Sequence, residues 1–301
     1  MIAQRCGHPT ANSAAAGLGW PRRTFALSPF RPFESLASMS LITSLHNERV
    51  KAAARLRDRR GRDRQGRILI DGARELLRAV RAGVRVLDIY WCAELARSDD
   101  AAAVLHSPGD ARVWQVTEAV FEKLAFGERA EGVVAVAEAA PLRLDELRLP
   151  PTPLVVVVEG VEKPGNLGAI LRTADGAGAA VVIACDGETD WHNPNVIRAS
   201  LGTVFTQPVC AASTSETLAW LRGQGLRIFA ARVEGARMYW EVSWREPVAV
   251  VLGAESTGLS DLWRANDITP IALPMRGVAD SLNVAATAAV LCYEAVRQRS
   301  G

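Results

Sequence analysis

Apolar and polar residues recur with two different periods along the chain, and the period predicts the type of element. Short apolar runs rich in β-branched and aromatic residues predict strands, whereas apolar residues three and four positions apart predict helices. In the first half of the chain the predicted strands are 67–72, 86–92, 111–116 and 131–138, and the predicted helices are 48–60, 73–82 and 117–124. Strands that alternate with helices predict a small, layered α/β unit.

The second half continues this alternation over a longer stretch. The predicted strands are 154–161, 180–185, 226–232, 248–253 and 268–274, and the predicted helices are 166–178, 193–202, 214–223, 259–265 and 284–299. The first of these strands, "LVVVVEGV", is nearly all apolar, which is typical of a strand covered on both faces. The pattern predicts an open, mostly parallel sheet wrapped by helices, and such sheets bind ligands beyond the carboxyl ends of their strands.

Two segments lack either period, and they divide the chain. "APLRLDELRLPPTP" (140–153) carries closely spaced prolines, which interrupt regular pairing and stiffen a linker. The residues before Met39 contain one acidic residue and no sustained periodicity. We expect a disordered extension (1–40) or a product of an upstream start codon there, in preference to a transit peptide. The expected domains are then 41–139 and 154–301.

Composition narrows the class of protein. Of the 301 residues, 49% are hydrophobic and 23% are charged, as in ordinary globular proteins, and the longest apolar runs are too short to cross a membrane. The five cysteines form no CxxC pair and the four histidines form no cluster. We therefore expect a reducing, cytoplasmic location and neither a metal site nor a membrane partner.

The net charge of +2 hides a strongly basic segment. Residues 49–81 contain twelve arginines and lysines against four acidic residues. Most charge runs are solvated helix faces, but arginine binds phosphate oxygens bidentately, and this imbalance favours contact with RNA or DNA. The candidate RNA-binding residues are Arg55, Arg59, Arg60, Arg62, Arg64 and Arg74.

Three loops in the second half follow predicted strands and carry unusual residues. They are "EKPGNLGAILRTADGAG" (162–178), "LGAESTGLS" (252–260) and "IALPMRGVADSLNVAATA" (271–288). In the first loop we expect Asn166 to cap a helix and Gly168 to let another surface come close. In the third, Ser281 and Asn283 place two short polar side chains where one N-cap would be enough. The pair is either a redundant cap or a ligand site, and three such loops at strand ends of one domain favour a ligand site.

These loops resemble motifs of a known family. "NLGAILRTADGAG", "VVLGAESTGLS" and "IALPMRGVADSLNVAATAAVLCYE" resemble, in order and spacing, the three motifs of the SpoU/TrmH RNA ribose 2′-O-methyltransferases, and the match spans residues 154–299. The basic segment, with "NERVKAAARLRDRRGR" before "GRILIDGARELLRAV", resembles the ribosomal-protein-L30e-like substrate-binding domain that many members carry.

The resemblance implies a fold, a cofactor and a set of site residues. The expected fold is a C-terminal α/β-knot domain, with a deep trefoil knot and a mostly parallel sheet, preceded by a smaller α/β L30e-like domain. The motifs place the catalytic positions at Arg172, Asn166, Glu255, Ser281 and Asn283. S-adenosylmethionine is expected against Leu252, Gly253, Ile271, Leu273, Ser281, Leu282 and Asn283. The chain reads "GAES" where "GNEG" or "GSEG" is frequent, and "EKPGN" where Asp-Pro more often precedes Gly-Asn.

The expected activity is 2′-O-methylation of a ribose in structured RNA, with 23S rRNA as the favoured substrate. A tRNA ribose methyltransferase and a non-catalytic RNA-binding protein on the same fold are the alternatives. A dinucleotide-dependent oxidoreductase is disfavoured because no G-x-G-x-x-G follows the first strand of the second half. We also expect a homodimer through the knot domain, since the terminal helix has a face of small apolar residues, namely Ala285, Ala288, Ala289 and Cys292.

Overall fold

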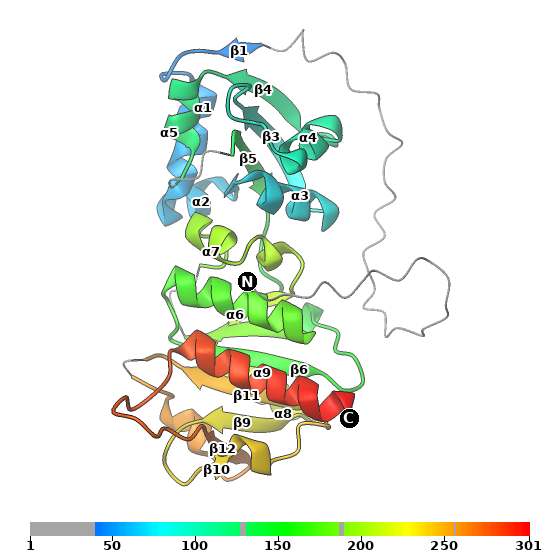
Figure 1. The fold of residues 1–301 in the computed structure, drawn as a ribbon, viewed down its shortest axis with the longest axis vertical. Coiled ribbons are helices and arrows are strands. Elements are labelled where there is room, and N and C mark those ends of the chain that lie inside the picture. The colour runs from blue at the N-terminus through cyan, green and yellow to red at the C-terminus, as the bar shows by residue number, and fades with distance from the viewer. Residues whose placement is uncertain (1–39, 127–130, 187–189, 256) are drawn as a thin grey trace, which may run out of the picture.

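The computed structural model describes residues 40–126, 131–186, 190–255 and 257–301, which form two α/β units stacked end to end (Figure 1). The expected N-terminal extension therefore lies almost wholly outside the described residues. The N-terminal unit contains β1 (Leu41–Ile42), α1 (Glu48–Ala54), η2 (Arg55–Arg57), α2 (Arg59–Gln65), β2 (Ile68–Asp71), α3 (Ala73–Arg81), β3 (Arg85–Trp91), α4 (Asp99–His106), β4 (Arg112–Val116), α5 (Glu118–Leu124) and β5 (Val133–Glu138).

The N-terminal sheet has the strand order β1-β4-β3-β5-β2 and is mixed, because β5 runs antiparallel to both β2 and β3. Successive residues of β2 point to opposite faces, as the two-residue period of a strand requires. Ile68 and Ile70 share a core cluster with Leu76 of α3, whereas Leu69 joins a second cluster with Phe121 of α5. Helices therefore cover both faces of the sheet.

The predicted single helix 48–60 is wrong, because the chain breaks at Asp58. Asp58 has extended backbone angles (φ −94°, ψ 143°) and separates η2 from α2. The Arg62 guanidinium stabilises this break, since it donates to the carbonyl oxygens of Leu56 (2.8 Å) and Arg57 (2.7 Å). Strand β1 and helix α4 were not predicted, although Ser98 caps α4 by accepting a hydrogen bond from the amide of Ala101 (3.1 Å).

The C-terminal unit contains the larger sheet. Its elements are β6 (Leu154–Glu159), α6 (Pro164–Ala177), β7 (Val181–Cys185), α7 (Pro194–Ala199), η4 (Thr203–Phe205), β8 (Val209–Ala212), α8 (Thr214–Gly223), β9 (Arg227–Ala231), β10 (Arg237–Met238), η5 (Tyr239–Glu241), β11 (Val248–Gly253), η6 (Asp261–Arg264), β12 (Ile268–Ala272) and α9 (Val284–Ser300). The strand order is β10-β12-β9-β11-β6-β7-β8, and the described strand pairs are all parallel.

This sheet is covered on both faces, as the apolar strand 154–161 predicts. Val156 and Val158 share a core cluster with residues of α6 and α9, whereas Val155 and Val157 pack in a second cluster with residues of α8. Figure 1 shows α6 and α9 side by side on one face of the sheet. Gly168 fits this packing, because a Cβ atom there would lie 2.4 Å from the Cβ of Ala199 on α7.

Three details of the second half differ from the prediction. Helix α6 begins at Pro164 with Lys163 as its N-cap residue, so Asn166 lies in the first turn and does not cap the helix. Proline is common at this first helical position because its missing N–H would be unpaired there anyway. The predicted helix 259–265 is the short 3₁₀ turn η6, and strands β8 and β10 were not predicted.

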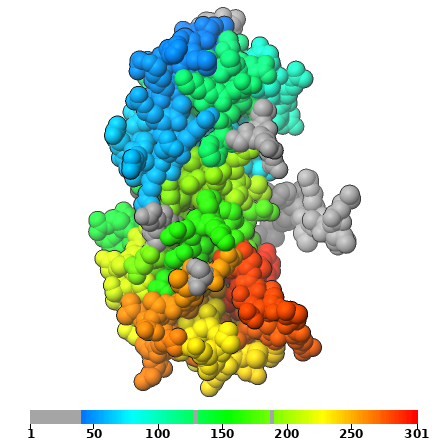
Figure 2. All heavy atoms as spheres, turned by 90° about the vertical axis from the view of Figure 1, so that its left-hand side faces the viewer, coloured from blue at the N-terminus to red at the C-terminus, as the bar shows by residue number. Residues whose placement is uncertain are grey.

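The segment 140–153 lies between the two sheets in sequence and packs against the second. It contains η3 (Leu144–Glu146), and Leu142 forms a bridge with Cys210 of β8. The two units also pack together directly. One core cluster continues from α3 through α7 into α6, and Figure 2 shows the two lobes in contact. Arg78 of α3 donates to the carbonyl oxygen of Leu201 (2.5 Å) across this junction.

Candidate active site

Three of the predicted site residues meet at the carboxyl ends of neighbouring strands. Asn166 lies in the first turn of α6 after β6, Glu255 follows β11, and Asn283 is the N-cap residue of α9. Strands β6 and β11 pair in parallel as far as Glu159 and Gly253, which brings their loops together. Asn283 Nδ2 donates to Glu255 Oε1 (2.7 Å) and to Asn166 Oδ1 (3.1 Å), and Asn166 Nδ2 lies 3.3 Å from Glu255 Oε1. We call these three residues the amide–carboxylate cluster.

Both polar atoms of the Asn283 side-chain amide form hydrogen bonds. Its Oδ1 accepts a hydrogen bond from the amide of Ala285 (2.9 Å) and so caps α9, while its Nδ2 organises the cluster. The second polar residue at this helix start, Ser281, is exposed, and within the described residues its side chain makes no hydrogen bond to the first turn of α9 or to the cluster. Ser281 is therefore not a redundant cap.

Lys163 completes the cluster, and the sequence did not single it out as a functional residue. Its Nζ lies 2.8 Å from Glu255 Oε2. The pKa of Glu255 is lowered mainly by this hydrogen bond from Lys163. The lowered pKa keeps the carboxylate ionised. The sequence did contain one indication of this role. Lys163 stands before Pro164 in "EKPGN", where the family more often has Asp.

A buried carboxylate, Glu159 at the end of β6, fixes the loop that carries Glu255. Only 7% of Glu159 is exposed. It accepts hydrogen bonds from Thr214 Oγ1 (2.7 Å), the amide and hydroxyl of Ser260 (2.7 and 2.8 Å), and Trp263 Nε1 (3.0 Å). Four donors offset the cost of burying the charge. Periodicity could not predict this role, because the donors lie 55 to 104 residues away along the chain, at Thr214 and in the segment 260–263.

The predicted cofactor residues lie at the ends of β11 and β12 and in the loop that follows. Leu252 and Ile271 are buried, Gly253 and Leu273 are half-buried, and Leu282 is exposed. A Cβ atom on Gly253 would lie 2.4 Å from the carbonyl oxygen of Gly258, so only glycine allows this tight loop. Residues 275–282 make no backbone–backbone hydrogen bond within the described chain. Apolar walls beside unpaired backbone groups fit an adenosine, which needs both.

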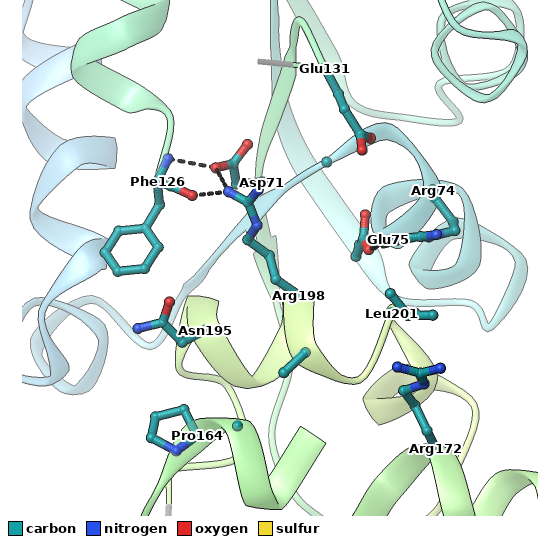
Figure 3. A pocket seen from close by; sticks show the side chains of 13 residues that line it. Asp71, Arg74, Glu75, Phe126, Glu131, Pro164, Arg172, Asn195, Arg198 and Leu201 are labelled. Atoms are coloured by element: carbon teal, nitrogen blue, oxygen red, sulfur yellow. Dashed lines mark hydrogen bonds and ion pairs between the residues drawn. The ribbon is translucent and has the colours of Figure 1, made fainter. Parts of the chain in front are cut away.

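Arg172 lies apart from the cluster and lines a pocket between the two domains (Figure 3). The pocket has a volume of about 620 Å³. Arg172 is exposed on α6, and Pro164 and Gly165 at the start of the same helix line the pocket as well. The pocket and the cluster therefore share the first turn of α6. The other lining residues are Asp71, Gly72, Arg74, Glu75, Phe126, Glu131, Asn195, Arg198, Ala199 and Leu201.

The six predicted RNA-binding arginines occupy three different environments. Arg55, Arg59, Arg60 and Arg64 are exposed on the N-terminal domain. Arg74 lines the pocket and pairs with Glu75 (2.9 Å). Arg62 is 6% exposed, and its guanidinium forms an ion pair with Asp190 of the C-terminal domain. The prediction for Arg62 is wrong, because its donors are used in joining the two domains.

The described residues lack two features that would point to other classes of protein. They contain no group of three or more histidine, cysteine, aspartate or glutamate side chains that could hold a metal ion. None of the described helices is both long enough and apolar enough to cross a membrane.

Comparison with known proteins identifies the class of enzyme that has this fold and site. Residues 153–293 match the model of the SpoU rRNA Methylase family, and residues 47–135 match the MRM3-like substrate binding domain. The chain belongs to the SpoU rRNA methylase family, whose members are S-adenosylmethionine-dependent methyltransferases.

Individual relatives cover most of the chain. It is 38% identical over 182 residues to the 23S rRNA (guanosine-2′-O-)-methyltransferase RlmB of Ralstonia nicotianae, covering 59% of this chain and 73% of the relative. It is 31% identical over 267 residues to the 23S rRNA (uridine(2479)-2′-O)-methyltransferase of Streptomyces viridochromogenes, covering 86% and 92%.

Solved structures agree with this assignment. A crystal structure of an RNA 2′-O ribose methyltransferase superposes with a TM-score of 0.77 at 41% identity, over 87% of this chain and all of that one (100%). An rRNA methyltransferase from Sinorhizobium meliloti with bound S-adenosylmethionine has a TM-score of 0.77 at 28% identity, over 86% and 98%. These neighbours confirm the predicted α/β-knot fold class and the predicted cofactor.

Proposed function

We propose that the protein transfers a methyl group from S-adenosylmethionine to a ribose 2′-oxygen of structured RNA, with 23S rRNA as the substrate. One observation carries the proposal. The amide–carboxylate cluster adjoins an arginine-lined pocket at the junction between the methylase domain and the substrate-binding domain. The choice of a ribose 2′-oxygen and of 23S rRNA is supported by the two relatives named above, which are both 23S rRNA 2′-O-methyltransferases. We treat residues 41–139 and 154–301 as the two functional domains.

The cofactor and the protein divide the work of the reaction. When bound, S-adenosylmethionine supplies a methyl group on a positively charged sulfur. We assign its binding to Leu252, Gly253, Ile271, Leu273 and the turn 281–283. The cluster supports this assignment, because Asn283 ties the turn to Asn166 and Glu255 and so limits its motion before the cofactor arrives.

Arg172 acts on the nucleophile in our proposal. A ribose hydroxyl is a poor nucleophile until its proton moves, and negative charge then develops on the 2′-oxygen. Arginine stays protonated in proteins, so Arg172 is suited to stabilise this charge and unsuited to remove the proton. Glu255 is also a weak base, because Lys163 lowers its pKa. We therefore propose that Glu255 positions Asn166 and Asn283, and that a water molecule or an RNA phosphate accepts the proton of the 2′-hydroxyl.

The same proposal covers partners and location. We propose a homodimer through the knot domain, on the family resemblance. The apolar face that we expected to form the interface does not support it, because Ala288 and Cys292 are buried in the core of the same chain. We propose a cytoplasmic location, because the named relatives are bacterial and bacterial ribosomes lie in the cytoplasm.

A methyl-transfer assay distinguishes this function from the two alternatives. The full chain is incubated with tritiated S-adenosylmethionine and separate samples of 23S rRNA, 16S rRNA and bulk tRNA. We expect label in 23S rRNA alone, and none with Asn166→Ala as the enzyme. Label confined to tRNA would support the tRNA alternative. RNA binding without transfer to any sample would support a non-catalytic binding protein.

A further inference from the structure

The pocket between the two domains contains a buried carboxylate with incomplete hydrogen bonding. Asp71, the last residue of β2, is 2% exposed. Its Oδ2 accepts from the amide of Phe126 (2.5 Å) and from Arg198 Nη1 (3.1 Å). Its Oδ1 is buried and has no partner within the described chain, and Figure 3 draws no interaction to it. An acceptor left unpaired in this way costs free energy, which a donor on a ligand would recover.

The partners that Asp71 already has do not compensate its charge fully. Burial is the largest influence on this carboxyl group, and it raises the pKa of Asp71 to about 6 in spite of the hydrogen bond from Phe126 and the charge of Arg198. A further N–H donor would favour the ionised form. The pocket lies beside the carboxylate and is open to receive one.

Three carboxylates and three arginines line the pocket among the described residues. Arg74 pairs with Glu75 and Arg198 with Asp71, which leaves Glu131 and Arg172 as the lining charges without an ion pair. Figure 3 shows Asp71 and Glu131 toward one end and Arg172 at the other. Glu131 Oε2 accepts from the amide of Ala73 (2.9 Å), so a carboxylate already occupies the N-terminal end of α3. A phosphate would be repelled there. Arg172 has no ion pair or hydrogen bond within the described residues and is available to an anion.

The two ends of a nucleotide complement the two ends of this pocket. Its base edge carries N–H donors, and its sugar and phosphate carry oxygen atoms and negative charge. A volume of about 620 Å³ is within the usual range of small-molecule pockets. Unpaired bases are the parts of RNA that proteins most often read by hydrogen bonds.

We propose that Asp71 determines which nucleotide is methylated, by accepting a hydrogen bond at Oδ1 from a ring N–H of its base while the ribose faces Arg172. This inference rests on the proposed function, because it gives that function its base specificity. Asp71 would act through the substrate base and not on the reacting atoms.

The test substitutes Asp71→Asn in the full chain. Asparagine keeps the shape, and its carbonyl oxygen can still accept from Phe126 and Arg198, so an NH₂ group replaces the unpartnered acceptor Oδ1. Binding of the four nucleoside 5′-monophosphates is measured by calorimetry in the presence of S-adenosylhomocysteine. We expect the nucleotide that binds the wild type best to lose about tenfold to a hundredfold in affinity, and the differences among the four to shrink.

Asp88→Asn is the matched control. Asp88 is 5% exposed, lies in the same domain and accepts from Trp114 Nε1 (2.9 Å) and Arg112 Nη2 (2.8 Å), but it does not line the pocket. It should keep the wild-type ranking of nucleotides. An equal loss for all four nucleotides in Asp71→Asn would show a structural role only and would overturn the proposal, as would no change.

A second measurement needs no variant, in case Asp71→Asn does not fold. The wild-type chain is titrated with guanosine and uridine monophosphates and with their analogues methylated at ring N1 and N3, which lack the N–H. We expect the preferred nucleotide to lose at least tenfold on methylation, and equal affinities would overturn the proposal. Methyl transfer to RNA without base preference would refute this inference alone. Nucleotide binding as proposed, without methyl transfer to any RNA, would refute the proposed function alone.

Discussion

Asn283 joins two functions that single substitutions can separate. Its Oδ1 caps α9 through the amide of Ala285, and its Nδ2 links Asn166 and Glu255. Asn283→Asp keeps an acceptor for the cap, and its negative charge suits a helix N-terminus. The same change places an oxygen 2.7 Å from Glu255 Oε1, where a donor was. We expect α9 to remain folded and the hydrogen bonds from residue 283 to Asn166 and Glu255 to be lost.

The magnitudes follow from the two sets of contacts. Asn283→Ala loses the cap, at a cost of about 1 kcal/mol, which corresponds to roughly 2–4 °C in the melting temperature of a domain of this size. It also loses two hydrogen bonds of the cluster, worth about 1.4 kcal/mol together, or about tenfold in affinity for S-adenosylhomocysteine if the turn 281–283 binds the cofactor. Asn283→Asp should show at least the tenfold loss of affinity with little change in melting temperature.

Calorimetric titration with S-adenosylhomocysteine measures the affinity, and differential scanning calorimetry measures the stability. Asn283→Ser is the control, because serine also caps helices but carries no amide. It should resemble Asn283→Asp in stability and Asn283→Ala in affinity. Wild-type affinity in Asn283→Asp, or losses of affinity that follow the melting temperature across all three variants, would refute the assignment of separate roles.

Three further predictions concern catalysis, RNA affinity and pH. Arg172→Ala should lower the single-turnover rate about a hundred- to a thousandfold while affinity for S-adenosylhomocysteine is kept, and Arg172→Lys should recover little; a wild-type rate at saturating RNA would contradict the role. Arg60→Gln with Arg64→Gln should weaken RNA binding and reduce the slope of log affinity against log salt by about 1–2, whereas an unchanged slope would remove both from the RNA surface. Burial lowers the pKa of His192 from 6.5 to about 4, so the unfolded chain binds more protons between these values. The buried, neutral His192 therefore contributes fully to the free energy of unfolding above pH 6.5, and this free energy falls by about 3 kcal/mol as the pH drops to 4. The raised pKa of Asp71 acts in the opposite direction, so the difference between wild type and His192→Gln in denaturant unfolding isolates the histidine, and a pH-independent difference would contradict the prediction.

Local pattern predicted the methylase domain better than the contacts between domains. The apolar run 154–161 and the loops after its neighbours were enough to place Asn166, Glu255 and Asn283 at one edge of a sheet, because parallel strands end at a common edge. Asn166 was wrongly assigned as a cap although Pro164 marks the first helical position.

The errors in the basic segment have a different cause. The sequence shows that Arg62 is charged, but its environment depends on Asp190, which lies 128 residues away. The pairing of Asp71 with Arg198 spans 127 residues in the same way. No periodicity links such positions. The packing of the two domains decides which arginines face RNA and which are buried at the junction.

The most direct test of the central claim locates the transferred methyl group. RNA labelled with tritiated S-adenosylmethionine by the wild-type chain is hydrolysed completely in alkali, which requires a free 2′-hydroxyl beside each cleaved phosphate. If the protein methylates ribose, the label appears in alkali-resistant dinucleotides. Label recovered only in mononucleotides would place the methyl group on a base and contradict the account.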